Sequence, residues 1–333
     1  MTASGTQMGR GTGDMLEQAL DRYALDHPQA ELIRHNENMT YKIDGGNKRY
    51  VLRIHKPVQG FSPGVFEGTG RAAFIKGELD ILSDLGRASG LIVQRPVRGK
   101  DGGLVQMIPD GTPITLLEWV EGNTVEAVEQ TPEICRDIGA LAAKMHLFFE
   151  EKAACGKEYH RYAYDQAVLS PLADRIRAAN RRKFIADQQQ RVILNALDEM
   201  HTRFDELDGL HRKILVHGDL SKSNMIVMAE GGITPIDFSL SGYSHFYMDI
   251  GGLFGHITKW EDRRHILEGY EAYRSCELSV RYLEPYFALQ VILFIACQYE
   301  RAAGWEWFEG KLEQWSNEIF SPLAEGRTFL DIG

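Results

Sequence analysis

The most constraining feature of this sequence is a pair of polar motifs separated by two short apolar runs. The first motif is Val216–Asn224, with the order Val-His-Gly-Asp-Leu-Ser-Lys-Ser-Asn, and the second is Pro235–Phe238, with the order Pro-Ile-Asp-Phe. The apolar runs flank Ala-Glu-Gly-Gly, residues 229–232, which is typical of a β-hairpin. A turn centred between Glu230 and Gly231 predicts that Asn224 and Asp237 face each other, with Cα atoms roughly 5 Å apart.

These residues offer oxygen ligands for a divalent cation. Mg²⁺ prefers a few protein oxygens and takes its remaining ligands from phosphates and water, so the Asn224 amide and the Asp237 carboxylate form a suitable pair. Asp219, on the preceding loop, supplies a third oxygen group. The alternative is that all three are ordinary turn residues, because Asp and Asn favour turns. The coincidence of four polar positions with a symmetric hairpin favours the metal site.

The spacing His-x-Asp-x-x-x-x-Asn followed by a later Asp, present between His217 and Asp237, is that of the kinase catalytic loop, with Gly218 where protein kinases have Arg. The chain therefore resembles the aminoglycoside phosphotransferase and choline kinase-like family. The resemblance covers residues 30 to 300 and implies an α+β, bilobal, protein kinase-like fold. We expect a tail over residues 1–13, an N-lobe with a small antiparallel β-sheet over 14–118 that binds nucleotide, and a larger, mainly helical C-lobe over 119–333.

The resemblance implies ATP and Mg²⁺ as cofactors and assigns roles to particular residues. Asp219 is expected to be the catalytic residue that accepts or orients the hydroxyl proton, while Asn224 and Asp237 hold Mg²⁺. Arg53, on the strand expected at 50–54, takes the place of the usual phosphate-pairing Lys. Glu78, on a helix expected from Arg71 to Leu85, would orient Arg53. The alternatives are Glu67 as the orienting residue, and Arg53 as an exposed strand residue without a ligand.

Three further groups of residues take roles by their position in the family pattern. The stretch after the fifth strand, Glu118, Trp119 and Val120, is expected to hold adenine through main-chain groups. His217 and Asp249 are expected to support the loop through hydrogen bonds. The segment from Gly242 to Glu261 is expected to line an acceptor pocket of aromatic and acidic character, with the candidates Tyr243, His245, Tyr247, Trp260 and Glu261.

Local patterns predict several other elements. Asp14 is a candidate N-cap for a helix that runs to about Leu25, and Thr131-Pro132 is a strong helix start. Short apolar runs at 91–93 and 104–107 predict strands. The most apolar segment, Phe287–Cys297, is interrupted by Gln290 and is shorter than the ~20 residues that a membrane helix needs, so we expect a buried helix.

Composition restricts the possible partners. The formal net charge of −10 argues against nucleic acid as a partner, because phosphate backbones are bound by dense Lys and Arg. The four cysteines show no Cys-x-x-Cys spacing, which fits a reducing compartment without a zinc site. Without a visible secretory signal in residues 1–13, we expect a cytoplasmic protein that is not bound to a membrane. The oligomeric state stays open.

The residues and the resemblance together predict transfer of the γ-phosphoryl group of ATP to a hydroxyl of a small-molecule acceptor. Within the family the acceptor classes include aminoglycosides, amino alcohols and homoserine. Two alternatives remain: a bacterial Ser/Thr protein kinase of the same family, and a catalytically inactive nucleotide-binding module. The presence of all three oxygen groups disfavours the inactive module.

Overall fold

The computed structural model describes residues 10–59, 71–88, 90–275 and 278–331. The chain forms two compact units, one made of Met1–Gln59 with Gln94–Val120 and the other of Gly60–Val93 with Glu121–Gly333. The expected lobe boundary at residue 118 lies close to the observed boundary at Val120. This division groups residues 60–93 with the second unit, whereas the expectation from the sequence is that they belong to the N-lobe.

Helix α2, Arg71–Ala88, shows why this segment joins the second unit. The helix packs against the chain at residues 160–161, where a Cβ on Gly77 would lie 2.4 Å from the carbonyl oxygen of His160. Arg161 also donates from Nη1 to the carbonyl oxygen of Phe74 at 2.6 Å. The expected helix at 71–85 is confirmed, while its packing could not be read from its apolar spacing.

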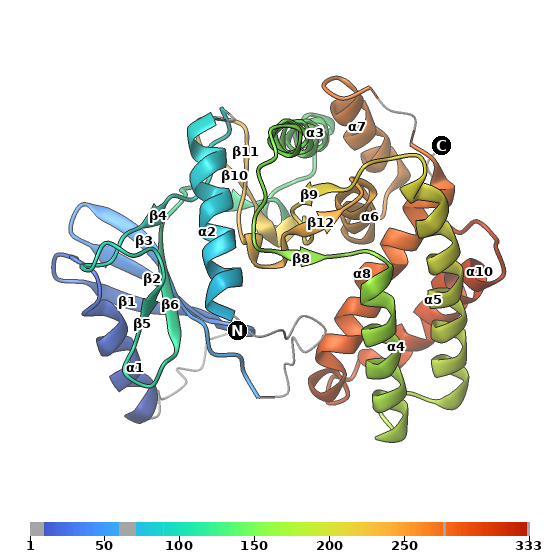
Figure 1. Cartoon of the computed structure of the whole chain (residues 1–333), viewed down its shortest axis with the longest axis horizontal. Helices are drawn as coiled ribbons and strands as arrows, with labels where there is room; N and C mark the ends of the chain where they lie inside the picture. The colour runs from blue at the N-terminus through green and yellow to red at the C-terminus, as the bar shows by residue number, and fades with distance from the viewer. Residues whose placement is uncertain (1–9, 60–70, 89, 276–277, 332–333) are drawn as a thin grey trace. The chain divides into compact units, whose positions relative to one another are not determined.

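The first unit is built on an antiparallel sheet with the strand order β1-β2-β3-β6-β4, and β5 also pairs with β6 (Figure 1). Apolar side chains of β2 and β3, among them Tyr41, Ile43, Leu52 and Ile54, form a core that α1 covers with Ala19. The strands are β1 (Gln29–His35), β2 (Met39–Gly45), β3 (Lys48–Ile54), β4 (Pro96–Val97), β5 (Gln106–Met107) and β6 (Pro113–Glu118).

Two local predictions in this region are wrong. Helix α1 spans Arg10–Leu20, so it begins four residues before Asp14 and ends before Leu25. Tertiary packing of its apolar side against the sheet outweighs the low helix propensity of its glycines. Residues 91–93 form no strand, and the pairing with β6 is made by Pro96–Val97 instead. Of the expected tail, residues 1–9 lie outside the described residues.

The second unit is mainly helical and carries two small sheets. Strands β10 (Met225–Val227) and β11 (Ile233–Pro235) form the expected hairpin, which β7 (Asn123–Thr124) extends. In the other sheet β12 (Gly242–Ser244) lies between β8 (Tyr162–Ala163) and β9 (Ile214–Val216). The helices after α2 are α3 (Pro132–Ala154), α4 (Gln166–Arg181), α5 (Asp187–Asp208), α6 (Tyr247–His256), α7 (Trp260–Glu271), α8 (Val280–Ala302), α9 (Phe308–Trp315) and α10 (Ser321–Ala324).

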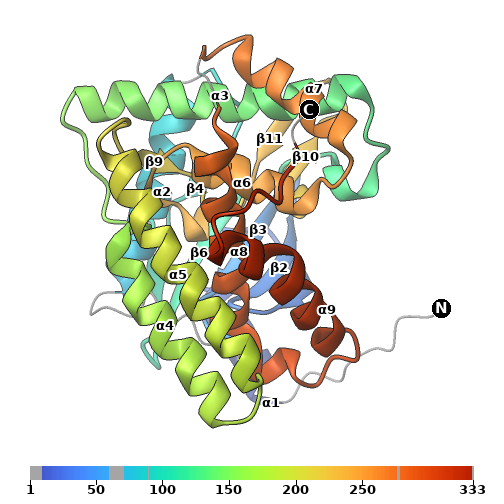
Figure 2. The ribbon, with the colours of Figure 1, turned by 90° about the vertical axis from the view of Figure 1, so that its right-hand side faces the viewer.

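Helix α8 is the only helix in the described part of the chain that is long and apolar enough to cross a membrane by length and composition alone. Twelve of its residues are buried, and it packs against α4, α5 and α6 within the second unit. Figure 2 shows α4 and α5 side by side next to α8. The expected buried helix is therefore confirmed.

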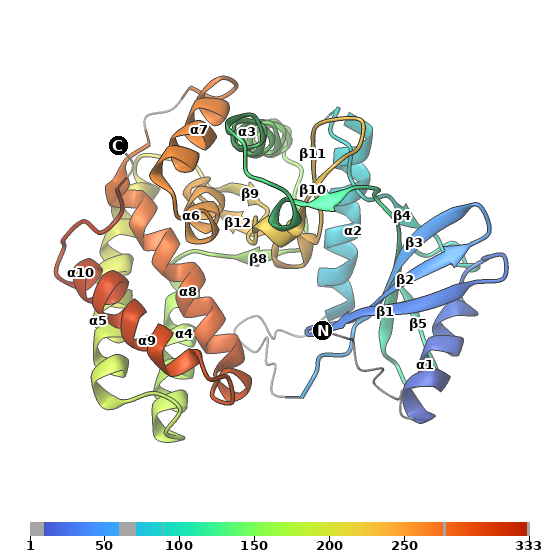
Figure 3. The same cartoon turned by 180° about the vertical axis from the view of Figure 1, so that it is seen from behind.

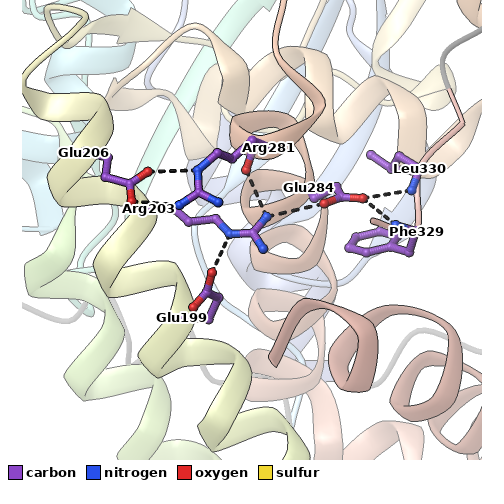
Figure 4. Close-up of polar contacts among 7 residues, drawn as sticks. All are labelled: Glu199, Arg203, Glu206, Arg281, Glu284, Phe329 and Leu330. Atoms are coloured by element: carbon purple, nitrogen blue, oxygen red, sulfur yellow. Dashed lines mark hydrogen bonds and ion pairs between the residues drawn. The ribbon is translucent and has the colours of Figure 1, made fainter. Parts of the chain in front are cut away.

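Buried charges on α8 are paired within the protein, as Figure 4 shows. Glu284 is 1% exposed and accepts a hydrogen bond from Arg203 of α5 at 3.3 Å through Oε2. Its Oε1 accepts the backbone N–H groups of Phe329 and Leu330 at 2.5 and 3.0 Å. A buried carboxylate without partners is costly, so these bonds stabilise Glu284 and fix the C-terminal segment onto α8.

Helices α3 and α7 lie side by side and approach each other through glycines (Figure 3). A Cβ on Gly139 of α3 would lie 1.9 Å from the carbonyl oxygen of Ile266, and one on Gly269 of α7 would lie 2.0 Å from that of Arg136. Real Cβ atoms do not approach backbone oxygen this closely, so any larger residue would separate the helices.

We predict that Gly139→Ala lowers the free energy of unfolding by about 1–3 kcal/mol or more, because overpacking outweighs the gain in helix propensity. The matched control is Gly310→Ala in α9, where an added Cβ meets no atom within 4 Å. That control should keep or slightly raise the melting temperature. Equal melting temperatures for the two variants in thermal denaturation would contradict the close approach.

Candidate functional site

The first sequence motif forms a loop, residues 217–224, that follows the buried strand β9. Gly218 has φ +81°, and a Cβ there would lie 2.2 Å from the carbonyl oxygen of Leu240. Only glycine adopts this conformation at so small a distance. The same Leu240 oxygen accepts the hydroxyl of Tyr164 at 2.6 Å, and Gln290 of α8 donates to the Gly218 oxygen at 2.9 Å. Gln290 therefore holds the start of the 217–224 loop, and Leu240 packs against Gly218.

The carboxylate of Asp249, on α6, holds the backbone of the 217–224 loop at its start. It accepts the N–H of His217 at 2.9 Å and the N–H of Gly218 at 2.8 Å. His146 of α3 lies with Nε2 3.0 Å from Asp249 Oδ2. Burial opposes ionisation of Asp249, but the hydrogen bonds from His146 and from the N–H of His217 outweigh it and hold the pKa of Asp249 below its ordinary value.

The side chain of His217 links the two motifs. Its Nε2 lies 3.1 Å from the carbonyl oxygen of Ile236, so Nε2 carries the proton and donates. Its Nδ1 accepts the N–H of Asp219 at 3.4 Å, and its ring packs on Phe238 with 4.4 Å between centroids. These contacts and those of Asp249 are the ones expected of supporting residues, while their effect on catalysis stays a prediction.

The hairpin pairs one residue out of the expected register. Met225 pairs with Pro235 and Val227 with Ile233, and the N–H of Ile236 donates to the oxygen of Asn224 at 2.9 Å. Asn224 therefore faces Ile236, and the expectation that it faces Asp237 is wrong. The reason is the turn, which has three residues between Met228 and Gly232 and has positive φ at Gly231 and Gly232.

Asp237 is not placed by the hairpin pairing but has an unusual backbone conformation. It lies two residues after the end of β11 with φ +66° and ψ +68°, a left-handed conformation that is rare for a residue other than glycine. Such conformations persist where surrounding structure enforces them and gather at functional sites. The side chain is buried, with 6% of the residue exposed.

Asn224 and Asp219 are joined directly. The Asn224 side-chain Nδ2 donates to the Asp219 carbonyl oxygen at 3.0 Å and to its carboxylate Oδ2 at 2.8 Å. Both hydrogens of the amide are thereby used on Asp219, which leaves Oδ1 as the atom of Asn224 suited to a cation. The amide orientation is thus set by the loop.

Two carboxylates in this corner disfavour each other's charge. Burial raises the pKa of Asp219, and the carboxylate of Asp237 raises it further, while His217 and the hydrogen bond from Asn224 act in the opposite direction. A divalent cation would relieve this repulsion. The donor set of two carboxylates and one amide oxygen therefore fits Mg²⁺. Among the described residues, no group of three or more His, Cys, Asp or Glu side chains gathers to hold a metal, so this site depends on the Asn224 amide as well as on carboxylates.

The cation predicted for phosphate, Arg53, lies on β3 between Thr40 of β2 and Thr115 of β6. It is 5% exposed, so the alternative of an exposed strand residue is wrong. Glu78, on α2, is 3% exposed. The two residues belong to different units, and their pairing stays a prediction. Glu67 lies outside the described residues.

The predicted adenine segment lies at the end of β6. The N–H of Glu118 donates to the oxygen of Arg95 at 2.8 Å, and the N–H of Trp119 donates to that of Arg49 at 2.9 Å. Both N–H groups serve the sheet of the first unit. A main-chain N–H contact to adenine would therefore fall to Val120, and the role of this segment stays a prediction.

Comparison with known proteins decides the family. The sequence model of the phosphotransferase enzyme family matches residues 29–283, well over half of the chain. The chain belongs to this family. It is therefore a phosphotransferase, and the predicted kinase-like α+β fold is confirmed by solved structures. No curated protein matches the sequence significantly.

Solved structures of several small-molecule kinases share the fold of this phosphotransferase. The microcompartment-associated aminopropanol kinase superposes with a TM-score of 0.75 and 21% identity, over 94% of this chain and 96% of that one. The amicoumacin kinase hAmiN, solved with AMP-PNP, Ca²⁺ and Ami, superposes with a TM-score of 0.74 and 19% identity, over 96% of this chain and 95% of that one. Choline kinase LicA from Streptococcus pneumoniae superposes with a TM-score of 0.62 and 16% identity, over 95% of this chain and 99% of that one.

The predicted acceptor pocket of this phosphotransferase needs correction. His245 and Tyr247 are 0% and 1% exposed, so protein packing covers them and they cannot line a pocket. The Tyr243 hydroxyl accepts the N–H of Tyr159 at 2.7 Å. Trp260 and Glu261 are exposed in the first turn of α7. His245 and Tyr247 follow β12 and lie in the core, because α6 starts at Tyr247 and its first residues are buried on all sides.

Residues that hold the 217–224 loop were partly missed at the sequence level. Gln290 was noted as an interruption of an apolar helix, and it donates to the Gly218 oxygen. The space for it comes from Gly252 of α6, where a Cβ would lie 3.2 Å from Gln290 Nε2. His146 and Tyr270 extend the Asp249 contacts, with 2.8 Å between His146 Nδ1 and the Tyr270 hydroxyl. A lone polar residue within an apolar helix was the available signal.

His245 instead provides a pH-dependent contribution to stability. Burial lowers its pKa to about 4, although Asp208 opposes the shift. Its Nδ1 lies 2.8 Å from the Tyr286 hydroxyl and its Nε2 lies 3.1 Å from the His211 oxygen, so the neutral ring meets both partners. Between pH 6.5 and 4 the unfolded chain binds a proton that the folded chain does not, so stability is lost as the pH falls through this window.

We predict that His245→Gln, which keeps a donor and an acceptor but does not titrate, flattens this pH dependence by up to about 1.4 kcal/mol per pH unit. Denaturant unfolding from pH 4 to 7 measures it. The control His201→Gln, on the exposed side of α5, should keep the wild-type profile. A wild-type slope in His245→Gln would refute the assignment.

Proposed function

We propose that this phosphotransferase transfers the γ-phosphoryl group of ATP, with Mg²⁺, to a hydroxyl of a small-molecule acceptor in the cytoplasm. The observation that carries the proposal is that Asp219 is hydrogen-bonded to Asn224 and is close enough to Asp237 for the two charges to interact, while Asp249 holds the backbone at the start of the 217–224 loop. The aminopropanol kinase and the amicoumacin kinase support it by their similarity in fold.

Asp219 is the residue for the acceptor hydroxyl. The hydroxyl oxygen forms a bond to the γ-phosphorus, the bond from that phosphorus to the β–γ bridging oxygen breaks, and the hydroxyl proton passes to the Asp219 carboxylate. A raised pKa suits a proton acceptor near neutral pH. Because the transition state is loose, positioning and charge neutralisation matter more than basicity.

The other residues bind and orient. Asn224, through Oδ1, and Asp237 would hold Mg²⁺, which neutralises charge on the phosphates when bound. Arg53, oriented by Glu78, would bind the α- and β-phosphates, since a guanidinium forks onto phosphate oxygens. The proposed acceptor class is an amine-bearing alcohol, such as an amino alcohol, an aminoglycoside or a homoserine-like compound.

A turnover screen tests the proposal. ADP release from MgATP should rise with one member of a panel of amino alcohols, aminoglycosides and homoserine, while Ser/Thr proteins give none. Phosphorylation of the proteins alone would favour the protein kinase alternative. Tight MgATP binding without turnover on any panel member would favour the inactive module.

We predict opposite defects for the two carboxylates. Asp219→Asn should reduce turnover by about 10²–10⁴-fold and leave nucleotide affinity within a few-fold, because Asp219 faces the acceptor. Asp237→Ala should weaken the thermal shift that MgATP produces. Loss of nucleotide binding in folded Asp219→Asn, or an unchanged MgATP shift in Asp237→Ala, would contradict these roles.

We predict that Arg53 and Glu78 act as a pair. Arg53→Lys should lose substantial activity although it restores the commoner residue, because a compact ammonium cannot replace a planar five-donor group. Arg53→Ala should lose more. A double-mutant cycle with Glu78→Ala, measured on the KM for ATP, should give a coupling above about 0.5 kcal/mol. A coupling free energy near zero between Arg53 and Glu78, in variants that still fold, would contradict this pairing.

A further inference from the structure

The second unit contains a cavity that the phosphotransfer residues do not line. Its volume is about 300 Å³, in the range of small-ligand sites. It lies where the end of α3, the segment before β9 and the turn after α7 meet. The lining residues are Glu150, Leu210, His211, Arg212, Ile214 and Arg274.

The cavity carries more positive than negative charge. Two guanidinium groups, those of Arg212 and Arg274, face one carboxylate, that of Glu150. Arg274 donates from Nε and Nη2 to Glu150 Oε1 at 3.1 and 2.7 Å, and its side chain is only 14% exposed. Its guanidinium also stacks 4.0 Å from the ring centroid of Phe246. Arg274 thus lies at the wall with its guanidinium ordered by these contacts, and Arg212 adds an exposed second cation.

His211 completes the polar wall. Burial lowers the pKa of its imidazole, and the neighbouring Arg274 lowers it further. The ring packs edge-on against Phe246 at 5.4 Å. A neutral imidazole beside two guanidinium groups offers a hydrogen bond without adding a charge, and an entering anion would favour its protonation.

A continuous line of hydrogen bonds leads from this wall to Asp249. Arg274 donates from Nη1 to the Tyr270 hydroxyl oxygen at 3.0 Å. That hydroxyl therefore uses its hydrogen on His146 Nδ1 at 2.8 Å, and His146 Nε2 donates to Asp249 at 3.0 Å. Every donor points towards Asp249, so the positive charge of Arg274 strengthens each following bond.

We propose that this cavity binds a small anion of the phosphate or carboxylate class and that the bound anion loosens the 217–224 loop. The anion draws the guanidinium of Arg274 away from Tyr270. The bonds through His146 then weaken, and Asp249 holds the N–H groups of His217 and Gly218 less firmly. The cavity is in this way an effector site separate from the acceptor.

Calorimetric titration of the full chain with inorganic phosphate, and separately with malonate, tests binding. Sodium chloride at equal ionic strength is the blank, and saturating AMP-PNP blocks the nucleotide site. We expect saturable binding that Arg212→Ser weakens at least about ten-fold, since a lost charged hydrogen bond costs 1.5–3 kcal/mol. The control Arg191→Ser, an exposed arginine of α5, should bind as wild type does.

Whichever of inorganic phosphate and malonate binds more tightly identifies the anion class. The NMR titration of His211 should show a raised pKa with the anion bound. Absence of binding by both anions, or equal binding by Arg212→Ser, overturns the site.

Amide hydrogen exchange tests the link to the loop and does not depend on phosphotransfer. The anion should make the amides of His217 and Gly218 exchange several-fold faster in the wild type. Tyr270→Phe keeps the ring and removes the hydroxyl, so it should still bind the anion but show no anion-dependent change. Unchanged or slower exchange in the wild type, or an undiminished response in Tyr270→Phe, overturns the coupling.

Discussion

The structure of the site depends on one buried carboxylate, that of Asp249. A buried charge without partners is costly, and here it is stabilised by two backbone N–H groups of the loop and by His146. The same contacts satisfy the N–H groups of His217 and Gly218, which the sharp turn at Gly218 keeps from pairing with a strand. Loop and helix therefore require each other, because either one alone would leave buried polar groups unpaired.

Close helix packing brings the partners of Asp249 within reach. Helix α6 carries Gly251 and Gly252, and a Cβ on Gly251 would lie 2.8 Å from the backbone nitrogen of Phe287. The small residues let α8 approach α6, so that Gln290 reaches the Gly218 oxygen. On the other side, Gly139 and Gly269 bring α3 and α7 together, which places His146 and Tyr270 in contact. Four glycines thus determine where the polar contacts form.

The sequence allowed the family, the fold class and the hairpin to be predicted, because they depend on local spacing. It did not allow the register to be predicted. Counting residues cannot distinguish a two-residue from a three-residue turn when Gly231 and Gly232 both permit positive φ. The acceptor residues failed for another reason. Polar aromatic residues such as His245 and Tyr247 look suited to a pocket, but their burial depends on helices distant in sequence, and no local pattern records those contacts.

Three carboxylates of the second unit, those of Glu284, Asp249 and Asp219, differ in their partners, and the difference supports the proposed metal site. Glu284 has a guanidinium and two N–H groups, and Asp249 has an imidazole and two N–H groups, so each is stabilised by the fold. Asp219 accepts a hydrogen bond from a neutral amide, and burial and the charge of Asp237 disfavour its ionisation, although His217 favours it. Because the charges of Asp219 and Asp237 repel each other, a bound cation would stabilise the ionised pair, and oxygen donors of this kind select a hard divalent cation.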